Sequence, residues 1–451
     1  MPTFFIRTYG CQMNERDSEA LACLLSSHGY TQVADENIAD VILFNTCSVR
    51  DQAERKVLGK MGILGKLKRK RPELVLGIIG CMAQSRGRSL LDDLPHVDLI
   101  VGTDCVHQIP AMLDECLHGT HGLVATEVSE GMPPELAGHQ GGGVSAFVSV
   151  MRGCNQFCSY CIVPYTRGRE KSRPIADVVA EVEQLAAEGT REVCLLGQNI
   201  TAYGVAEARK AGIHDPEASA FAELLQAVHG VPGIQRIRFT SPHVGYMNDT
   251  FVAAITSLPK VCKSFHIPVQ SGSNRILKLM RRGYTAEEYL DRVARIRERL
   301  DDVAFTTDVI VGFPGETAEE FAATRDLMNH VGFDMAYIFR YSVRTGTKAA
   351  ENLPDDVPED VKMERNQLLL ADLAARSTTG NQRYLGKDLQ VLVEGPSRRN
   401  PARWTGRCDT NKVVNFEPPE GGLVRGDLVA VHIEHTTANS LLGTVSGIDD
   451  C

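Results

Sequence analysis

The sequence predicts an α/β multidomain chain with three parts: an N-terminal doubly wound parallel sheet, a central partial (βα)6 barrel, and a small C-terminal antiparallel β-barrel. Three observations support this prediction. Short apolar runs alternate with helical patterns over residues 1–120, which is typical of parallel sheets. The alternation resumes over residues 144–378. Over residues 379–449 strand-like runs follow one another, separated by Gly and Pro, as in small barrels.

The N-terminal part contains four apolar runs of strand type, separated by helical patterns such as residues 15–27, where Leu21, Leu24 and Leu25 share one side. The runs lie at residues 3–7, 41–45, 74–80 and 98–102. Residues 121–143 are rich in Gly and Pro and lack periodicity, so we expect a linker there, including the Gly131-Met-Pro-Pro stretch.

The central part contains six strand candidates separated by helical patterns. The strands are expected at residues 146–151, 192–196, 236–240, 264–269, 305–311 and 335–341, and helices at 174–188, 275–300, 317–331 and 358–377. Six units without a reversal predict an open partial barrel rather than a closed eightfold one. The C-terminal strands are expected at residues 389–394, 407–416 and 428–434.

The composition of the 451-residue chain is ordinary for a globular protein, with 43% hydrophobic and 23% charged residues. Its apolar runs are shorter than a membrane span, and the N-terminus lacks the layout of a signal peptide, so we expect a cytoplasmic protein. The net charge of −9 does not indicate nucleic-acid binding. Thirteen cysteines, an odd number, favour metal ligands and buried thiols over a disulfide framework.

Cys154, Cys158 and Cys161 are spaced so that one short loop can direct three thiolates at one point. A cubane iron–sulfur cluster has four irons, so three protein thiolates leave one iron open to a substrate or cofactor. Zinc is the alternative, but structural zinc usually takes a fourth protein ligand from a second Cys or Cys/His pair, and no such pair lies nearby. The sequence therefore predicts an open iron–sulfur cluster.

Cys11, Cys47 and Cys81 each follow one of the first three predicted strands. Because the carboxyl ends of parallel strands line one crevice, these cysteines can converge although they are distant in sequence. Cysteine is also a common core residue, which is the alternative. Cys105 follows the fourth strand in the same way, so position alone does not separate a ligand from a structural thiol.

The 154–161 spacing resembles the signature of the radical S-adenosylmethionine (SAM) enzymes. The stretches Tyr9-Gly-Cys-Gln-Met-Asn14, Asn45-Thr-Cys-Ser-Val-Arg50 and Gly80-Cys-Met-Ala-Gln84 resemble the N-terminal domain of the methylthiotransferases, a branch of that family. The resemblance covers essentially the whole chain, and the stretch from Arg407 to Phe416 is similar to the RNA-binding TRAM module. It implies that Cys11, Cys47 and Cys81 hold an auxiliary 4Fe–4S cluster. Cys105 has no counterpart and is expected to be structural.

The resemblance also implies the reaction. Two 4Fe–4S clusters serve two SAM molecules per turnover: one SAM methylates a sulfur on the auxiliary cluster, and the other is cleaved to a 5′-deoxyadenosyl radical. No catalytic side chain is expected beyond the cluster ligands. The implied partners are a tRNA substrate and an electron donor such as flavodoxin or ferredoxin, with no membrane partner, and we expect a monomer.

Seven residues beside the cluster loop or near the ends of the barrel strands are expected to contact SAM, because barrel active sites lie at that end. They are Tyr160, Gly197, Gln198, Gln270, Ser271, Asp308 and Arg340. Each has a structural alternative: core packing for Tyr160, a turn for Gly197, helix caps for Gln270, Ser271 and Asp308, and a surface ion pair for Arg340. His243 and His266 are isolated and expected to be structural.

Substrates within the family include isopentenylated adenosine beside the tRNA anticodon, threonylcarbamoyl adenosine at the same site, and an aspartate of a ribosomal protein. Stretches beginning at Ser48, Ile162 and Arg238 resemble the isopentenyladenosine branch. Basic residues expected to contact RNA are Arg167, Arg169, Lys171, Arg173, Arg407 and Lys412, with a basic run over residues 60–71 whose alternative is a solvated helix end. A non-catalytic iron–sulfur RNA sensor is a further alternative.

Overall fold

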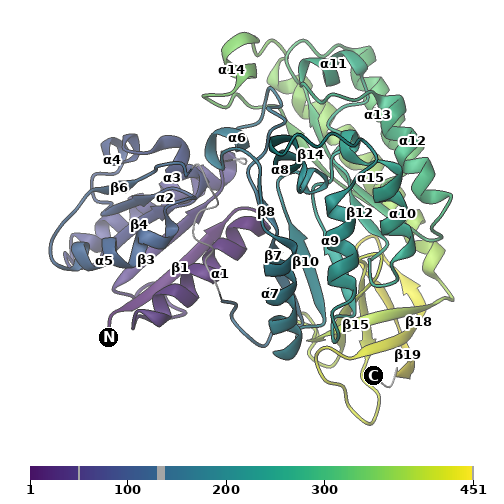
Figure 1. Ribbon diagram of the computed structural model, residues 1–451, viewed down its shortest axis with the longest axis horizontal. Coiled ribbons are helices and arrows are strands. Elements are labelled where there is room, and N and C mark those ends of the chain that lie inside the picture. Colours follow the sequence, from purple (N-terminus) through teal and green to yellow (C-terminus); the bar gives the residue numbers. More distant parts are fainter. Residues whose placement is uncertain (49–50, 130–137, 449–451) are drawn as a thin grey trace.

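The computed structural model describes residues 1–48, 51–129 and 138–448 (Figure 1). Its N-terminal part is a six-stranded parallel sheet in the order β2-β1-β3-β4-β5-β6. The strands are β1 (Thr3–Tyr9), β2 (Thr31–Gln32), β3 (Val41–Thr46), β4 (Val75–Ile79), β5 (Leu99–Val101) and β6 (Leu123–Ala125). The helices are α1 (Gln12–Ser27), α2 (Asp51–Lys68), α3 (Cys81–Arg86), α4 (Ser89–Asp93), η1 (Val106–Gln108) and α5 (Ile109–Leu117).

Both faces of this sheet are covered, because alternate side chains of the strands feed two separate cores. Phe4, Leu43 and Leu99 pack against α1 and α5 on one face, and Phe44, Leu76 and Ile100 pack against α2 and α4 on the other. The predicted doubly wound sheet is therefore confirmed. Strand β6 lies inside the predicted linker, so the linker boundary at residue 121 was wrong, while Gly131 to Pro134 lie outside the described residues.

The central part is an open barrel of six parallel strands, as predicted, in two hydrogen-bonded groups, β7-β10-β11 and β12-β13-β14. The strands are β7 (Ser145–Ser149), β10 (Glu192–Leu196), β11 (Arg236–Phe239), β12 (Ser264–His266), β13 (Ala304–Val311) and β14 (Met335–Arg340). A bridge between Ile237 and Val261 joins the two groups. Strands β8 (Met151–Arg152) and β9 (Lys171–Ser172) form a separate hairpin.

Helices separate the strands of the central part, and the longer ones cover the outside of the barrel (Figure 1). They are α6 (Val163–Thr166), α7 (Ile175–Ala187), η2 (Ile200–Ala202), α8 (Val205–Lys210), α9 (Ala220–His229), η3 (Val244–Tyr246), α10 (Asp249–Ser257), α11 (Asn274–Leu279), α12 (Ala286–Arg297), α13 (Ala318–Val331), α14 (Lys348–Asn352) and α15 (Glu359–Asn381). The single helix expected over 275–300 is two, because Arg281 and Gly283 adopt φ values of 57° and 71°, which an α-helix cannot continue through.

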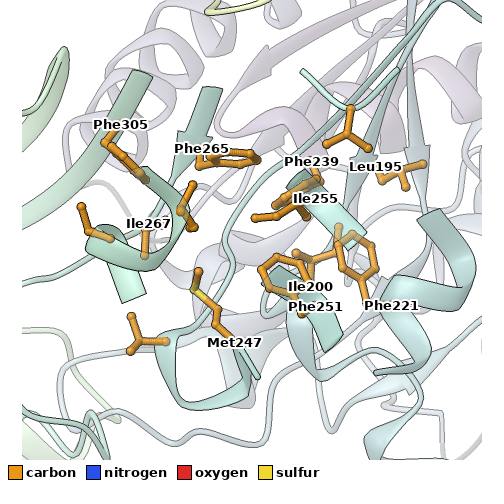
Figure 2. Close-up of a cluster of buried hydrophobic side chains, with 14 of the residues drawn as sticks. Leu195, Ile200, Phe221, Phe239, Met247, Phe251, Ile255, Phe265, Ile267 and Phe305 are labelled. Atoms are coloured by element: carbon orange, nitrogen blue, oxygen red, sulfur yellow. The ribbon is translucent and has the colours of Figure 1, made fainter. Parts of the chain in front are cut away.

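An aromatic cluster fills the space between the barrel strands and their outer helices (Figure 2). The Phe221 and Phe239 ring centroids lie 5.3 Å apart at 83°, the edge-to-face arrangement that aromatic rings favour. Phe239 and Phe265 continue the contact from β11 to β12, with centroids 5.8 Å apart. The buried aromatic rings thus join the two strand groups, which share only one backbone bridge.

The C-terminal part is a closed five-stranded barrel in the order β15-β16-β17-β19-β18. The strands are β15 (Asp388–Pro396), β16 (Trp404–Cys408), β17 (Val413–Glu417), β18 (Leu428–Thr436) and β19 (Leu441–Ile448), preceded by η4 (Gln382–Tyr384). The run expected as one strand over 407–416 is a hairpin, because Asn411 turns the chain at φ 64°. One pair, β17 with β19, is parallel, so the barrel is not wholly antiparallel as predicted.

Side chains of the central barrel hold the other two parts in place. The Asp17 carboxylate of α1 accepts hydrogen bonds from Arg152 Nη2 at 2.7 Å and from Arg167 Nη2 at 2.9 Å. On the opposite side, Arg238 of β11 donates to the carbonyl oxygens of Cys408 and Asp409, at 2.8 and 3.0 Å. The N-terminal sheet and the C-terminal barrel therefore contact the same central domain. Among the described residues, no helix is long and apolar enough to cross a membrane.

Candidate active site

The first cysteine set lies on the loop between β8 and α6. The Cys154 N–H donates to the carbonyl oxygen of Gly168 at 3.1 Å. Phe157, between two of the cysteines, adopts a left-handed φ of 47°, which is uncommon for a bulky residue and typical of functional loops. Gly153 has φ 78°, and a Cβ there would lie 2.1 Å from the carbonyl oxygen of Arg169. The loop that carries the thiols is therefore fixed by its backbone.

A buried cation accompanies this set. Arg282 Nη1 donates to Cys158 Sγ at 3.4 Å, and Arg282 Nη2 donates to the carbonyl oxygen of Pro268 at 3.0 Å. Burial raises the pKa of Cys161 to about 12, and the neighbouring Cys158 thiol adds to the rise. Burial likewise raises the pKa of Cys154. Without a metal these two thiols are protonated at neutral pH, and iron binding would displace their protons.

The second cysteine set converges at the carboxyl ends of the neighbouring strands β1, β3 and β4. Cys11 is the N-cap of α1, Cys81 is the first residue of α3, and the Cys47 N–H donates to the carbonyl oxygen of Tyr9 at 2.9 Å. Two of the three thiols thus lie at helix N-termini, where the backbone N–H groups favour a thiolate.

Two asparagines beside this second set are joined by hydrogen bonds. Asn14 Nδ2 donates to Asn45 Oδ1 at 2.7 Å, and Asn45 Nδ2 donates to the carbonyl oxygen of Asn14 at 2.9 Å. Gly80, with φ 88°, lies against them, and a Cβ at that position would be 2.3 Å from Asn45 Oδ1. Only glycine fits at this contact.

The charge around the second set favours an ionised thiol. A hydrogen bond with Cys47 lowers the pKa of Cys11 to about 5, against the opposing effect of burial and with help from the Arg167 guanidinium. Burial raises the pKa of Cys81, and Arg167 partly opposes that rise. Arg167, which is only 4% exposed, therefore interacts electrostatically with both these thiols and with Asp17.

One cysteine of the first set and two of the second line adjoining cavities. A cavity of about 790 Å³ is lined by Cys161 and Tyr160, and one of about 520 Å³ is lined by Cys11 and Cys47. Asp308 of β13 and Phe339 of β14 line both cavities. The N-terminal sheet, the central barrel and the C-terminal barrel, through Asn411, all contribute walls to the second cavity.

Each set consists of three cysteines, the donor type that iron–sulfur clusters take. No group of three His, Cys, Asp or Glu side chains in the described part of the chain is placed to hold one metal ion. A cubane distributes its protein ligands over different irons, so its thiolates stand wider apart than those around one zinc. Beyond β10, Gln198 Oε1 is buried and accepts no hydrogen bond, which leaves an acceptor for a ligand N–H group.

Four of the seven residues expected to contact SAM share the first cavity with Cys161: Tyr160, Gln270, Asp308 and Arg340. Gln270 adopts φ 69°, a strained conformation held by β13 through the Asp308 carbonyl, to which its N–H donates at 2.9 Å. The surface alternative for Arg340 is also realised, because it pairs with Glu359.

Two of the seven have packing contacts that account for their positions, and their contact with SAM stays a prediction. Ser271 is fully buried, and its hydroxyl lies 3.2 Å from Thr324 Oγ1, so it braces α13 rather than the cavity. Gly197 lies against Met151, whose Cγ would be 2.6 Å from an added Cβ, so its role is close packing. Neither structural alternative is realised as expected, because Ser273 rather than Ser271 caps α11 and Gly197 serves close packing.

Three of the six basic residues expected to contact RNA are buried, which corrects that expectation. Arg167 contacts Asp17, Lys171 lies 3.6 Å from Asp104, and Arg173 lies 2.5 Å from Glu181. Charge density in the sequence was misleading because interior acids neutralise these side chains.

The other basic residues are accessible to different degrees. Arg169 is exposed and stacks over Phe157, with its Cζ 4.3 Å from the ring centroid. Arg407 pairs with Glu394 at 3.0 Å, and Lys412 with Asp334 at 3.0 Å. In the basic run, Lys60 pairs with Glu36 and Lys68 with Asp98, so two of its charges are neutralised within the protein.

Several site residues were missed by sequence reasoning. His266, expected to be structural, lines the second cavity, and so do Met335 and Tyr337 of β14. The alternation of β14 was visible in the sequence, but nothing there indicated that its apolar side chains face a cavity rather than a core. Nothing in the sequence pattern indicated Arg282 or Asn411, because both lie in irregular turns outside the periodic elements.

Comparisons with known proteins agree with this architecture. The family model of the radical SAM superfamily matches residues 148–328, that of the uncharacterized protein family UPF0004 matches residues 3–102, and that of the TRAM domain matches residues 382–446. The fold is similar to that of the radical S-adenosylmethionine methyltransferase TsrM from Kitasatospora setae, with TM-score 0.56 and 14% identity over 83% of this chain and 89% of that chain.

Two full-length relatives are more similar in sequence. Proteins described as tRNA-2-methylthio-N(6)-dimethylallyladenosine synthase from Opitutus terrae and Akkermansia muciniphila are 49% and 46% identical to this chain. The first match covers 97% of this chain and 96% of the relative, and the second covers 98% of each.

Proposed function

Because the chain belongs to the radical SAM methylthiotransferases, in the family of the tRNA-2-methylthio-N(6)-dimethylallyladenosine synthases, we propose that it inserts a methylthio group at C2 of N6-isopentenyladenosine next to the anticodon of tRNA. The observation that carries the proposal is the pair of adjoining cavities, one lined by Cys161 and the other by Cys11 and Cys47. A reaction that needs a radical source and a sulfur carrier requires two such sites facing one substrate.

The proposed cofactors are two 4Fe–4S clusters and two SAM molecules per turnover. Cys154, Cys158 and Cys161 would hold one cluster, and Cys11, Cys47 and Cys81 the other. When bound, the first cluster with SAM supplies a carbon radical, and the second carries the sulfur to be inserted. An unactivated aromatic C–H bond offers no acidic proton, which explains why no acid–base pair is needed.

The protein's own residues supply charge and orientation in this proposal. Arg282 beside Cys158, and Arg167 beside Cys81 and Cys11, place a buried positive charge next to each thiolate set and so offset its negative charge. Tyr160 would contact the SAM adenine, and Gln198 would accept a hydrogen bond from the SAM amino group.

The proposed partners are tRNA and an electron donor such as flavodoxin or ferredoxin, and the proposed working form is a cytoplasmic monomer with no membrane partner. Arg169, Arg407 and Lys412 remain candidates for RNA contact. We propose domain boundaries at residues 1–125, 144–378 and 379–449, with the first extended to include β6.

Product analysis tests the proposal. The protein, reconstituted with iron and sulfide, is incubated with SAM, a reductant and tRNA that carries isopentenyladenosine, and the nucleosides are separated by mass spectrometry. We expect the isopentenyladenosine to gain a methylthio group. Methylthiolation of threonylcarbamoyl adenosine, or of a ribosomal-protein aspartate, with isopentenyladenosine unchanged would overturn the proposed substrate.

A further inference from the structure

Strand β14 presents an unusual row of exposed apolar side chains. Met335, Tyr337 and Phe339 are 42%, 44% and 37% exposed, whereas Ala336, between them, is 8% exposed. The alternation follows from the strand geometry, because successive side chains point to opposite faces. The Ala336 face packs toward α15, where Asn366 Nδ2 donates to the carbonyl oxygen of Ile338 at 2.8 Å. The opposite face leaves the row, named here the β14 row, open.

The β14 row lies along both cavities rather than on the outer surface. All three side chains line the cavity that contains Cys11 and Cys47, and Phe339 also lines the cavity that contains Cys161. Exposed large apolar side chains in a row cost solubility unless they serve a ligand. Here the row runs between the two sites that the proposed reaction requires.

The aromatic members of the row are arranged as a platform. The Tyr337 and Phe339 rings are stacked, with centroids 6.4 Å apart and planes at 17°. His266 meets Tyr337 edge to face at 6.1 Å, and its Nδ1 lies 2.9 Å from Thr306 Oγ1, which fixes the ring. Aromatic side chains held in this way offer a flat face on which a nucleobase can stack.

We propose that the β14 row is the specificity-determining surface for the substrate base: Tyr337 and Phe339 stack on the adenine, and Met335 contacts its apolar dimethylallyl group. This inference rests on the proposed function, since it takes a prenylated adenine as the occupant. The match is chemical. A planar base with a branched apolar substituent suits aromatic rings beside a flexible thioether. The row offers no charged group to an anionic substituent such as threonylcarbamoyl, and Arg238, which lines the same cavity, is already paired with Glu192.

Binding measurements test the inference separately from catalysis. Anticodon stem-loop RNAs with and without the dimethylallyl group are titrated against the reconstituted full chain, and the ratio of the two dissociation constants is compared between variants. Met335→Ala should reduce the preference for the prenylated RNA, whereas Tyr337→Ala should weaken binding of both RNAs roughly tenfold to a hundredfold. Met363→Ala on α15 is the matched control, because Met363 is 45% exposed but does not line either cavity.

The outcomes distinguish the inference from the proposed function. A wild-type protein that binds both RNAs equally, a Met335→Ala variant that keeps the full preference, or a Tyr337→Ala variant that keeps wild-type affinity overturns the inference. A wild-type protein that prefers the prenylated RNA through the row, yet forms no methylthio product, supports the inference and contradicts the proposed function. Iron content equal to that of the wild type verifies that each variant assembles its clusters.

Discussion

At the scale of single residues, the clearest constraint lies at Gly80, which has no room for a side chain. Gly80 and Gly29 have nearly the same φ, 88° and 85°, but a Cβ at Gly29 would meet nothing within 4 Å. Replacing Gly29 by Ala costs roughly 1 kcal/mol for its positive φ. Gly80 also has ψ −153°, a region that glycine alone adopts readily, so its replacement costs roughly 1–3 kcal/mol in the backbone. Gly80→Ala should cost a further 1–3 kcal/mol or so, because it displaces Asn45.

Thermal unfolding of the two variants measures the difference, and iron counting shows whether displacing Asn45 disturbs the neighbouring Cys81 and Cys47. We expect Gly29→Ala to keep the wild-type iron content and Gly80→Ala to lose part of it. Equal melting temperatures for the two variants would show that the close approach to Asn45 does not constrain the fold.

Replacing the cysteine sets should remove one cluster at a time. The wild-type protein, reconstituted with iron and sulfide, should hold about eight irons per chain, and the Cys11→Ala, Cys47→Ala, Cys81→Ala triple variant about four. Replacing Cys154, Cys158 and Cys161 should also leave about four and in addition abolish SAM cleavage. About four irons in the wild type, unchanged when Cys11, Cys47 and Cys81 are replaced, would contradict the second cluster.

Residue spacing identified the cysteines but not the partners of the basic residues. Cys11, Cys47 and Cys81 could be placed together because strand ends in a parallel sheet meet at one edge. The sequence predicted that Arg167 and Arg173 contact RNA, yet both are buried and paired, with Asp17 and Glu181 respectively. Their ion pairs span distant segments, and no local pattern encodes such pairing.

At the scale of elements, a buried histidine ties α1 to α7. His139 Nδ1 lies 3.2 Å from Glu19 and its Nε2 2.7 Å from Glu181, with Arg16 and Arg173 also beside Glu181. Burial disfavours the charged ring, but hydrogen bonds with Glu181 and Glu19 outweigh it and raise the pKa of His139 above its ordinary 6.5. The charged ring therefore holds the two helices together.

This contact should depend on pH in a defined direction. Because the folded-state pKa of His139 is raised, its stabilisation is fully present below pH 6.5 and is lost as pH rises through the raised value. His139→Gln should therefore lower the melting temperature most at acidic pH, and the two proteins should converge at alkaline pH. A melting-temperature difference that grows with pH would contradict this assignment.

Strand β11 fastens the C-terminal barrel to the central one. Arg236 donates to the carbonyl oxygens of Gln390, at 2.7 Å, and of Arg407. Arg236→Met should loosen the C-terminal barrel, so limited proteolysis should release it faster and the KM for tRNA should rise severalfold, since charged hydrogen bonds of this kind contribute about 1.5–3 kcal/mol. Arg376→Met, a change at a partly exposed arginine that donates to the carbonyl oxygen of Met328 within the central domain, is the control. Equal proteolysis rates for the two variants would contradict the fastening role.

Long periodic elements were predictable, and short edge elements were not. All six strands of the central barrel lie where apolar runs predicted them, because the strands of parallel sheets are mostly apolar. Strands β2 and β6 escaped prediction because edge strands of two or three residues carry too little pattern. Strand β19 is formed by Leu441–Ile448, where Gly and Ser interrupt the alternation.

At the scale of the whole molecule, the three parts are arranged around one substrate space. The sequence predicted three domains and two cysteine sets, but not that Asp308 and Phe339 would line both cavities or that Asn411 of the C-terminal barrel would join the second. Such contacts depend on how domains pack together, and domain packing leaves no periodic signal along the chain. The aromatic side chains of β14 line the cavities only because the three parts pack in this way.

The central claim is that the two cysteine sets hold clusters that face each other across this space. Electron paramagnetic resonance of the fully reduced, reconstituted protein tests it most directly, because two nearby paramagnetic clusters speed each other's spin relaxation. We predict faster relaxation in the wild type than in either triple cysteine variant. The claim would be contradicted by a wild-type spectrum equal to the sum of the two single-cluster spectra, with relaxation as slow as in the single-cluster variants.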